Sequence, residues 1–530
     1  MKIGLGHSFT LPGRRPRQKG LTAGLAVCLG TAFGPAAVPG ASSAATIPVG
    51  CCADTACKGT ANFTLRIAIN HAGDGDTVDM GSLPLACSTI TLTGGEIAIP
   101  QANLTITGPS DRTVTVSGNN VGRVLYHSGT GVLTLNNFSV ANGHTSGYGG
   151  CIASLGALSA YNMQIHACSA HRGGCTYSSF YTFLNHGTNV SSCNASGDAG
   201  AVLSLGNTTL NASSVSGSTA YAGAGGILAI GNIVSLHGSI LDNTAGPVAG
   251  GLYAGGHVYL VQSVVRGNKA ESCGGIAFSG TYATLTSSTV ESNSALTGSG
   301  GGICGKTDFG GSPRTVTLNS STVSNNNAFL TGGGVDIQGR TSSNFPTNLI
   351  VSNSTISGNA AGGSGGGIHM FYGVATIHNS TIAFNAAPTG GGLYAGRHSN
   401  NGQEFQCSIE PDSSIFAKNG GSTIGADLFF NDCALATPHS DDNVVVSSNQ
   451  FLSGWITADP RLAPLAYHGG PVQTHALLPG SPAIDAGGNR DNQSTDERGT
   501  GYPRIVGAGV DVGAYERQLA DDEIFYDGFN

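Results

Sequence analysis

The most regular feature of the chain is a recurrence of short apolar runs, each preceded by glycine or another small residue. The last small residue before a run falls at ten positions, spaced by 24 to 27 residues in seven steps and by 32 and 33 in two. These positions are Gly150, Gly174, Ala201, Gly226, Gly251, Gly275, Gly302, Gly334, Gly367 and Gly392. Such a repeat indicates one structural unit stacked many times.

A second column, of polar residues, keeps the same spacing. Motifs such as STISGN and STVESN place an apolar residue three positions before a polar one. The polar positions are Cys168, Cys193, Ser218, Asn243, Asn268, Asn293, Asn326, Asn359, Asn385 and Asn419. We expect the asparagines to form a ladder of side-chain hydrogen bonds at a turn.

The runs alternate apolar and polar residues as β-strands do, for example in ATLTSSTV and RTVTLNSSTV. Helical repeats are longer, and the leucine and asparagine pattern of leucine-rich repeats is missing. The sequence therefore predicts an all-β chain, a parallel β-helix with about three short strands per turn and glycine at its corners. We expect one continuous coil with at most a short capping helix near Leu65–His71.

The N-terminal residues predict that the coil is exported from the cell. Residues 1–45 have basic residues, a short apolar run and small residues near Ala45, as in a secretory signal peptide. The formal net charge of −8 argues against general nucleic-acid binding. We expect no transmembrane segment in the mature chain, because the apolar run is too short for a good anchor.

Two segments resemble known bacterial surface proteins. DPRLAPLAYHGGPVQTHALLPGSPAIDAG with TDERGTGYPRIVGAGVDVGAYE is similar to the choice-of-anchor Q domain of bacterial β-helix proteins, and FTLRIAI with GDTVDM is similar to a segment named for its CSLREAI motif. The repeats themselves resemble those of polymorphic outer-membrane proteins, which are surface adhesins. The resemblance implies a right-handed β-helix, secreted or exposed on a bacterial surface, without a defined reaction.

These observations divide the chain into five parts. They are a signal peptide (1–45), an N-terminal cap with the first rungs (46–145), the parallel β-helix repeats (146–450), a choice-of-anchor Q-like segment (451–517) and an acidic tail (518–530).

Cysteine usage suggests disulfides. The chain has 13 cysteines, and removal of Cys28 with the signal peptide leaves an even number in an exported protein. Residues in one column of adjacent rungs have Cα atoms ~4.8 Å apart, within the range of a disulfide. We expect the pairs Cys151–Cys175, Cys168–Cys193 and Cys407–Cys433, with Cys273 and Cys304 unpaired.

The extra residues of the long steps point to a ligand site. They read KTDFGGSPR, GRTSSNFPT and, after Gly392, GRHSNNGQEFQCSIEPD. Solenoid insertions gather on one face, often the binding face. Because residues alternate along a strand, Asp336, His369 and Tyr394 should stack on the surface, with His369 on the floor of a notch and Asp336 fixing its orientation. Further candidates for ligand contacts are Lys306, Gln338, Phe371, Tyr372, Arg397 and His398.

Two functions remain open. The first is binding or adhesion, to an extracellular polysaccharide or a cell-surface glycan. The second is a polysaccharide lyase or glycosidase in a groove around His369, with His369 or Tyr394 as the base. No zinc motif is present, so neither a metal nor a cofactor is predicted. The acidic stretch at Asp74–Asp79 could bind calcium, but a turn is the better interpretation.

Overall fold

The computed structural model describes residues 44–57, 63–306, 313–339, 346–397, 407–421, 425–436, 442–450 and 453–518. The predicted signal peptide, at 1–45, lies almost wholly outside these residues, and so does the predicted acidic tail beyond Gln518.

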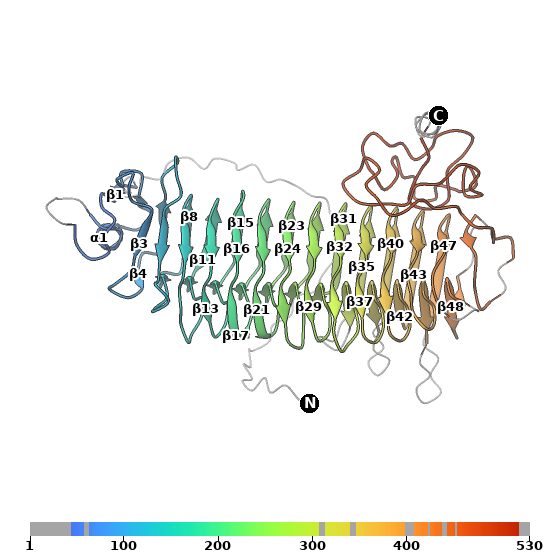
Figure 1. The fold of residues 1–530 in the computed structure, drawn as a ribbon, viewed down its shortest axis with the longest axis horizontal. Helices are drawn as coiled ribbons and strands as arrows, with labels where there is room; N and C mark the ends of the chain where they lie inside the picture. Colours follow the sequence, from blue (N-terminus) through green and yellow to red (C-terminus); the bar gives the residue numbers. More distant parts are fainter. Residues whose placement is uncertain are drawn as a thin grey trace, which may run out of the picture. The chain divides into compact units, whose positions relative to one another are not determined.

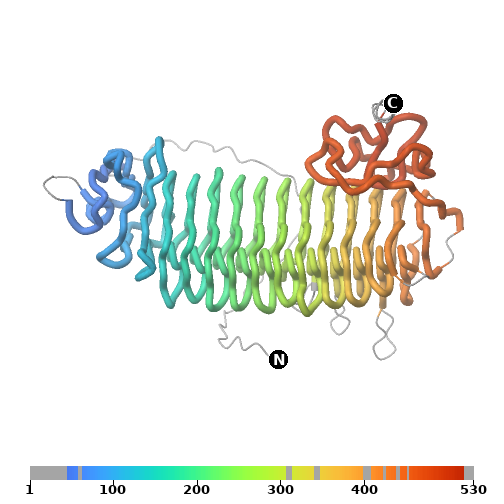
Figure 2. The backbone as a smooth tube through the Cα atoms, in the orientation of Figure 1, coloured from blue at the N-terminus to red at the C-terminus, as the bar shows by residue number. Residues whose placement is uncertain are grey.

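The described chain winds into a parallel β-solenoid, which confirms the predicted fold (Figure 1). Each full turn adds one strand to each of three sheets, which have 15, 13 and 14 strands, and eight turns add a two- to five-residue strand to a fourth sheet. One such turn contains β10 (Ile152–Ser154), β11 (Ala157–Tyr161), β12 (Gln164–His166) and β13 (Ser169–Ala170). The path of the coil is followed most easily in Figure 2.

The sheets begin and end at nearby points of the chain. The 15-stranded sheet runs from β1 (Thr46–Pro48) to β49 (Ala434–Leu435), the 13-stranded sheet from β4 (Ile97–Ile99) to β48 (Leu428–Asn431), the 14-stranded sheet from β3 (Thr89–Thr91) to β50 (Val444–Val445), and the fourth from β13 to β41 (Ala360–Ala361). With one strand per turn, the 13-stranded sheet gives the coil about 13 turns.

The described residues contain one helix, α1 (Leu65–His71), at the predicted position. Thr64 caps it, because the Thr64 side chain accepts a hydrogen bond from the Ile67 amide at 3.2 Å. Leu65, Ala68 and Ile69 are buried against the first strands. No helix of the described chain is long and apolar enough to cross a membrane.

Alternation along each strand builds the core. In β11, Leu158 and Ala160 are fully buried inside the coil, whereas Tyr161 is 43% exposed. The same alternation recurs from rung to rung, so the interior is a continuous column of valine, isoleucine and leucine.

The predicted asparagine ladder is present and buried. Asn326 donates from its main-chain and side-chain nitrogen atoms to Oδ1 of Asn359, both at 2.9 Å, and its side-chain amide also donates to the carbonyl of Val290. The pattern continues from Asn359 to Asn385. The Asn326 side chain thus satisfies buried groups of the previous rung and bonds the asparagine of the next.

Six disulfides are present, and two predicted pairings are wrong. The pairs are Cys51–Cys57, Cys52–Cys87, Cys151–Cys168, Cys175–Cys193, Cys273–Cys304 and Cys407–Cys433. The Cys407–Cys433 pair is confirmed. The expected pairs Cys151–Cys175 and Cys168–Cys193 between rungs are replaced by pairs within a rung, and Cys273 and Cys304 are bonded to each other.

The interior of the coil explains the pairing. In later rungs the glycine before a strand lies against the ladder asparagine of the same turn, so that a Cβ on Gly226 would be 3.0 Å from Nδ2 of Asn243. Cys151 and Cys168 occupy these two columns, as do Cys175 and Cys193. The predicted small-residue column is therefore wrong by one position in these two rungs, since Cys151 and Cys175, and not Gly150 and Gly174, lie in register with Ala201 and Gly226. The side chains point at each other across the rung, whereas residues stacked in one column point in parallel.

Residues 453–518 form no helix or regular strand and cover part of the 14-stranded sheet. They contact the outer faces of β36 (Thr322–Ser324), β40 (Thr355–Ser357) and β44 (Thr381–Ala383). The Thr322 hydroxyl donates to the Gln473 carbonyl at 2.6 Å, and the Thr381 hydroxyl accepts from the Ala514 amide at 3.0 Å.

Candidate functional site

The predicted site lies in one column on the outer side of the 13-stranded sheet. The strands β38 (Val335–Gln338), β42 (Ile368–Phe371) and β45 (Leu393–Gly396) pair in parallel, with Asp336 beside His369 and His369 beside Tyr394. The predicted stacking of these three residues is therefore confirmed. We call this column of outward residues the outer column.

The outer column is not an open surface, which corrects the sequence-based expectation. Asp336 is fully buried and His369 is 6% exposed. The turn before each strand folds back over it: Gly365 has a φ of 67°, and a Cβ there would be 2.7 Å from Cα and Cβ of His369. A glycine is needed at this place because only it allows both the positive φ and the close approach.

The chemical character of the outer column changes along the coil. In seven earlier rungs its residues are apolar or aromatic. They are Ala153, Tyr177, Leu203, Leu228, Tyr253, Ala277 and Cys304. Most of them form a small hydrophobic core of their own beneath the turns. A buried carboxylate and an imidazole, those of Asp336 and His369, follow in the next two rungs.

The side chains of Asp336 and His369 are hydrogen-bonded to each other. Nδ1 of His369 lies 2.8 Å from Oδ1 of Asp336. The carboxylate also accepts hydrogen bonds from Thr331 Oγ1 and from Gln338 Nε2, each at 3.1 Å. Because Asp336 engages Nδ1, the orientation of the imidazole is fixed and Nε2 is the nitrogen available for a ligand or a proton.

An aromatic ladder continues the column beyond His369. The ring of His369 stacks on that of Tyr394 at 5.2 Å between centroids, and Tyr394 stacks on Phe429 of β48 at 5.6 Å, with interplanar angles of 10° and 8°. The Tyr394 hydroxyl accepts from Nδ2 of Asn431 at 2.8 Å. The faces of the Tyr394 ring are therefore covered by neighbouring rings, and its edge and hydroxyl are what a ligand would contact.

The other predicted ligand residues are distributed unevenly. Gln338 and Phe371 lie beside each other two positions further along their strands, and both are half-buried. Tyr372 is 4% exposed, so its ring is not available for stacking on a ligand. Lys306 lies in register with Gln338. Arg397 follows β45 and is partly exposed. His398 lies outside the described residues, as do the central parts of the three inserted segments.

Sequence reasoning missed Thr331, Phe429 and Asn431. Phe429 lies one rung beyond Tyr394, but the 35 residues between them exceed every step of the predicted repeat, so the period did not reach it. Thr331 could not be found from the register either, since it contacts Asp336 from the turn rather than from a strand.

The cysteines at the start of the repeats do not form a metal site. The sulfur atoms of Cys151, Cys168 and Cys175 lie within 4.8 Å of one another. All three belong to the disulfides described above, so they carry no thiolate that could bind a metal. At the N-terminal cap, Asp74 and Asp76 accept main-chain hydrogen bonds from Asn103 and Gly73, as expected for turn residues.

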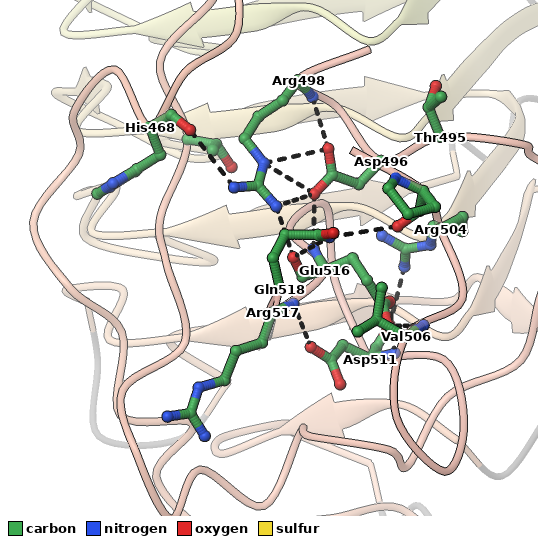
Figure 3. Close-up of polar contacts among 12 residues, drawn as sticks. His468, Thr495, Asp496, Arg498, Arg504, Val506, Asp511, Glu516, Arg517 and Gln518 are labelled. Atoms are coloured by element: carbon green, nitrogen blue, oxygen red, sulfur yellow. Dashed lines mark hydrogen bonds and ion pairs between the residues drawn. The ribbon is translucent and has the colours of Figure 1, made fainter. Parts of the chain in front are cut away.

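A second group of charged residues is buried in the C-terminal segment (Figure 3). The Arg498 guanidinium donates to both carboxylate oxygens of Asp496 and is sandwiched between the rings of Tyr502 and Tyr515, at 4.0 and 3.9 Å. Glu516 accepts hydrogen bonds from the amides of Val506 and Asp511. These carboxylates hold main-chain groups of an irregular segment in place, which is a structural role.

Comparison with known proteins adds little. No family model matches the chain, and no curated protein matches it. A crystal structure of pectate lyase Pel9A is similar over 90% of this chain and 98% of that chain, at 12% identity and a TM-score of 0.27. A likeness of this strength carries no argument, and the family resemblances seen in the sequence stay predictions.

Proposed function

We propose that the protein is exported and binds a polysaccharide outside the cell, with the polar part of the outer column as its ligand site. The observation that supports this most is the Asp336–His369 pair, a buried hydrogen-bonded pair in a column that is apolar or aromatic in seven other rungs. Buried polar pairs without a structural counterpart in equivalent positions are typical of functional sites.

Two further features favour an extended extracellular ligand. Six disulfides fit an oxidising compartment. Rungs ~4.8 Å apart place equivalent side chains in a straight row, along which a polymer can make the same contact repeatedly. Gln338, Phe371 and the Tyr394 hydroxyl would then provide contacts beside His369.

A polysaccharide lyase is the second candidate, and one observation favours it. The contact of Asp336 with Nδ1 leaves Nε2 of His369 as a base that could remove a proton next to a uronate carboxylate. Arg397, and Lys306 in the neighbouring column, would hold that carboxylate.

The test uses His369→Ala and Asp336→Ala on a glycan array, with the ultraviolet absorbance of unsaturated products as the readout for a lyase. We expect at least a tenfold loss of glycan binding in both variants. The fold should tolerate alanine, because Ala153 and Ala277 occupy the same column. A loss of product with binding retained would identify the lyase.

The matched control is Leu228→Ala, a buried residue of the same column without polar contacts. It should lower the melting temperature and leave binding unchanged. Wild-type binding and turnover in both the His369 and the Asp336 variant would contradict the proposal.

A further inference from the structure

One corner of the coil adopts the same unusual backbone conformation in eleven successive rungs. The residue directly after each strand of the 14-stranded sheet, from β9 (Ser139–Ala141) to β47 (Ile415–Ala417), has a positive φ between 53° and 70°. In nine rungs this corner holds a small or short polar residue. These are Asn142, Ala167, Ser192, Gly217, Asp242, Gly267, Ser292, Asn325 and Gly358.

The last two rungs break this rule. Phe384 and Lys418 occupy the same corner, both with a φ of 58°. A Cβ atom comes close to the backbone in the left-handed conformation, and bulky residues adopt it more rarely than asparagine or aspartate, whose short polar side chains can bond locally. Strain of this kind persists where the side chain is needed for something else. Glycine, asparagine or serine would adopt the positive φ of this corner with less strain, and residues of this kind occupy it in most of the nine other rungs.

Phe384 and Lys418 both line a cleft between the coil and the C-terminal segment. The cleft has a volume of about 620 Å³, within the usual range for small-ligand sites. On the coil side it is lined by Asn325, Ser357, Gly358, Phe384 and Lys418, and on the segment side by Leu462, Pro464, Leu465, Gln473 and His475. The Phe384 ring packs against the ring of His475, with 5.0 Å between centroids, and the residue is still 41% exposed, so packing against the segment uses only part of its surface.

The cleft carries little net charge. The Lys418 ammonium is paired with the carboxylate of Asp459 at 2.8 Å. His475 is buried, which lowers its pKa to about 4, so its ring is neutral at physiological pH. Its two nitrogen atoms are engaged by the Ala463 carbonyl and the Ser357 hydroxyl, at 2.7 and 2.8 Å. An anionic ligand would therefore gain no attraction from this cleft.

We propose that this cleft binds a neutral saccharide, with one sugar ring lying on Phe384. Aromatic rings present an apolar platform to the C–H face of a pyranose. The side-chain amides of Asn325 and Gln473 and the Lys418–Asp459 pair supply donors and acceptors for sugar hydroxyls at the rim. The site is separate from the outer column, because its coil residues follow strands of a different sheet, and it does not depend on the role of His369.

The test compares Phe384→Asn with the wild type by calorimetric titration of cellotriose, xylotriose and mannotriose, with trigalacturonate as the acidic probe. We expect the wild type to bind at least one neutral trisaccharide and to bind trigalacturonate more weakly. Phe384→Asn should weaken that binding at least tenfold. Its melting temperature should be unchanged or higher, because asparagine tolerates the positive φ that Asn325 already adopts.

Two controls make the result specific. Phe329→Asn replaces an aromatic residue that is 63% exposed and lies outside the cleft, so binding should not change. Leu228→Ala, in the apolar part of the outer column, should also leave trisaccharide binding unchanged, because Leu228 lies in neither proposed ligand site. Absence of neutral-sugar binding, binding that survives Phe384→Asn, or a drop of several degrees in the melting temperature of that variant would each overturn the proposal.

Discussion

Three adjacent glycines, Gly365 to Gly367, illustrate how much a single side chain is constrained in this coil. A Cβ on Gly365 would meet His369, one on Gly366 would be 2.4 Å from the carbonyl oxygen of Ala386 in the same turn, and one on Gly367 would be 3.0 Å from the side chain of Asn385. Each glycine is thus required by a different neighbour. The third makes room for the ladder asparagine, on whose hydrogen bonds the corner depends.

At this scale we predict that Asn326→Ala strongly destabilises the coil. The substitution leaves the buried main-chain and side-chain nitrogen atoms of Asn293 without the acceptor that they share, Oδ1 of Asn326. We expect the free energy of unfolding to fall by about 2–4 kcal/mol, since each unsatisfied buried group costs about 1–3 kcal/mol. Chemical denaturation measures it.

The neighbouring Asn327→Ala is the control for this prediction. Asn327 is exposed, so its substitution should change the free energy of unfolding by about 0.5 kcal/mol or less. Equal effects of the two substitutions would show that the ladder does not stabilise the coil.

The first rungs of the repeat differ from later rungs in the pair of residues that meet across the interior of the coil. Where later rungs place a glycine against an asparagine, these place cysteine against cysteine, with Cα atoms 5.5 Å apart for Cys151–Cys168 and 5.4 Å for Cys175–Cys193. A disulfide within the rung replaces the asparagine ladder, which begins at Asn243.

We predict that peptide mapping without reductant links Cys151 to Cys168 and Cys175 to Cys193. The digestion must be done at low pH, because the sulfur atoms of adjacent pairs are close enough to exchange. A link between Cys151 and Cys175 would contradict the structure. The double variant Cys151→Ser with Cys168→Ser should lose about 2–4 kcal/mol of stability.

The whole molecule combines the coil with an irregular C-terminal segment, and buried acids join the two. Glu497 accepts a hydrogen bond from the main-chain nitrogen of Thr355, and its carboxyl group also lies against the hydroxyls of Thr355 and Thr322, all on the coil. Burial raises the pKa of Glu497 to about 8, and burial raises that of Glu516 to about 8 as well. Both acids are therefore largely protonated at neutral pH in the folded protein.

This predicts that the attachment of residues 453–518 weakens as the pH rises. A folded-state pKa above the unfolded value of 4.5 means that the folded protein binds more protons between pH 4.5 and 8. The stabilisation is complete below that window, falls through it by up to about 1.4 kcal/mol per pH unit for each group, and is lost above pH 8. Limited proteolysis of the segment between pH 5 and 9 measures it.

Glu497→Gln mimics the protonated acid, so it should reduce this pH dependence, leaving the part due to Glu516. The exposed Glu271→Gln is the control and should leave the profile unchanged. A segment that becomes more resistant to protease as the pH rises would contradict the assignment.

The sequence by itself determined the coil, its ladder and, from Ala201 onward, the register of the small-residue column. One periodic signal, repeated in ten rungs, fixes which residues share a column, and alternation fixes which point inward, as Asn326 and Ile368 show. The same register predicts that Asp336, His369 and Tyr394 lie side by side, because parallel stacking makes equivalent positions of successive repeats neighbours in space.

Only the tertiary structure decided which residues of different columns contact one another. The turn that buries His369, the pairing of Cys151 with Cys168 across the interior, and the cleft at Phe384 all join positions in different columns. Such contacts depend on the path of the chain around a corner and on where the C-terminal segment docks. A repeat period carries no information about either, since it relates equivalent positions of successive rungs and not different positions of one rung.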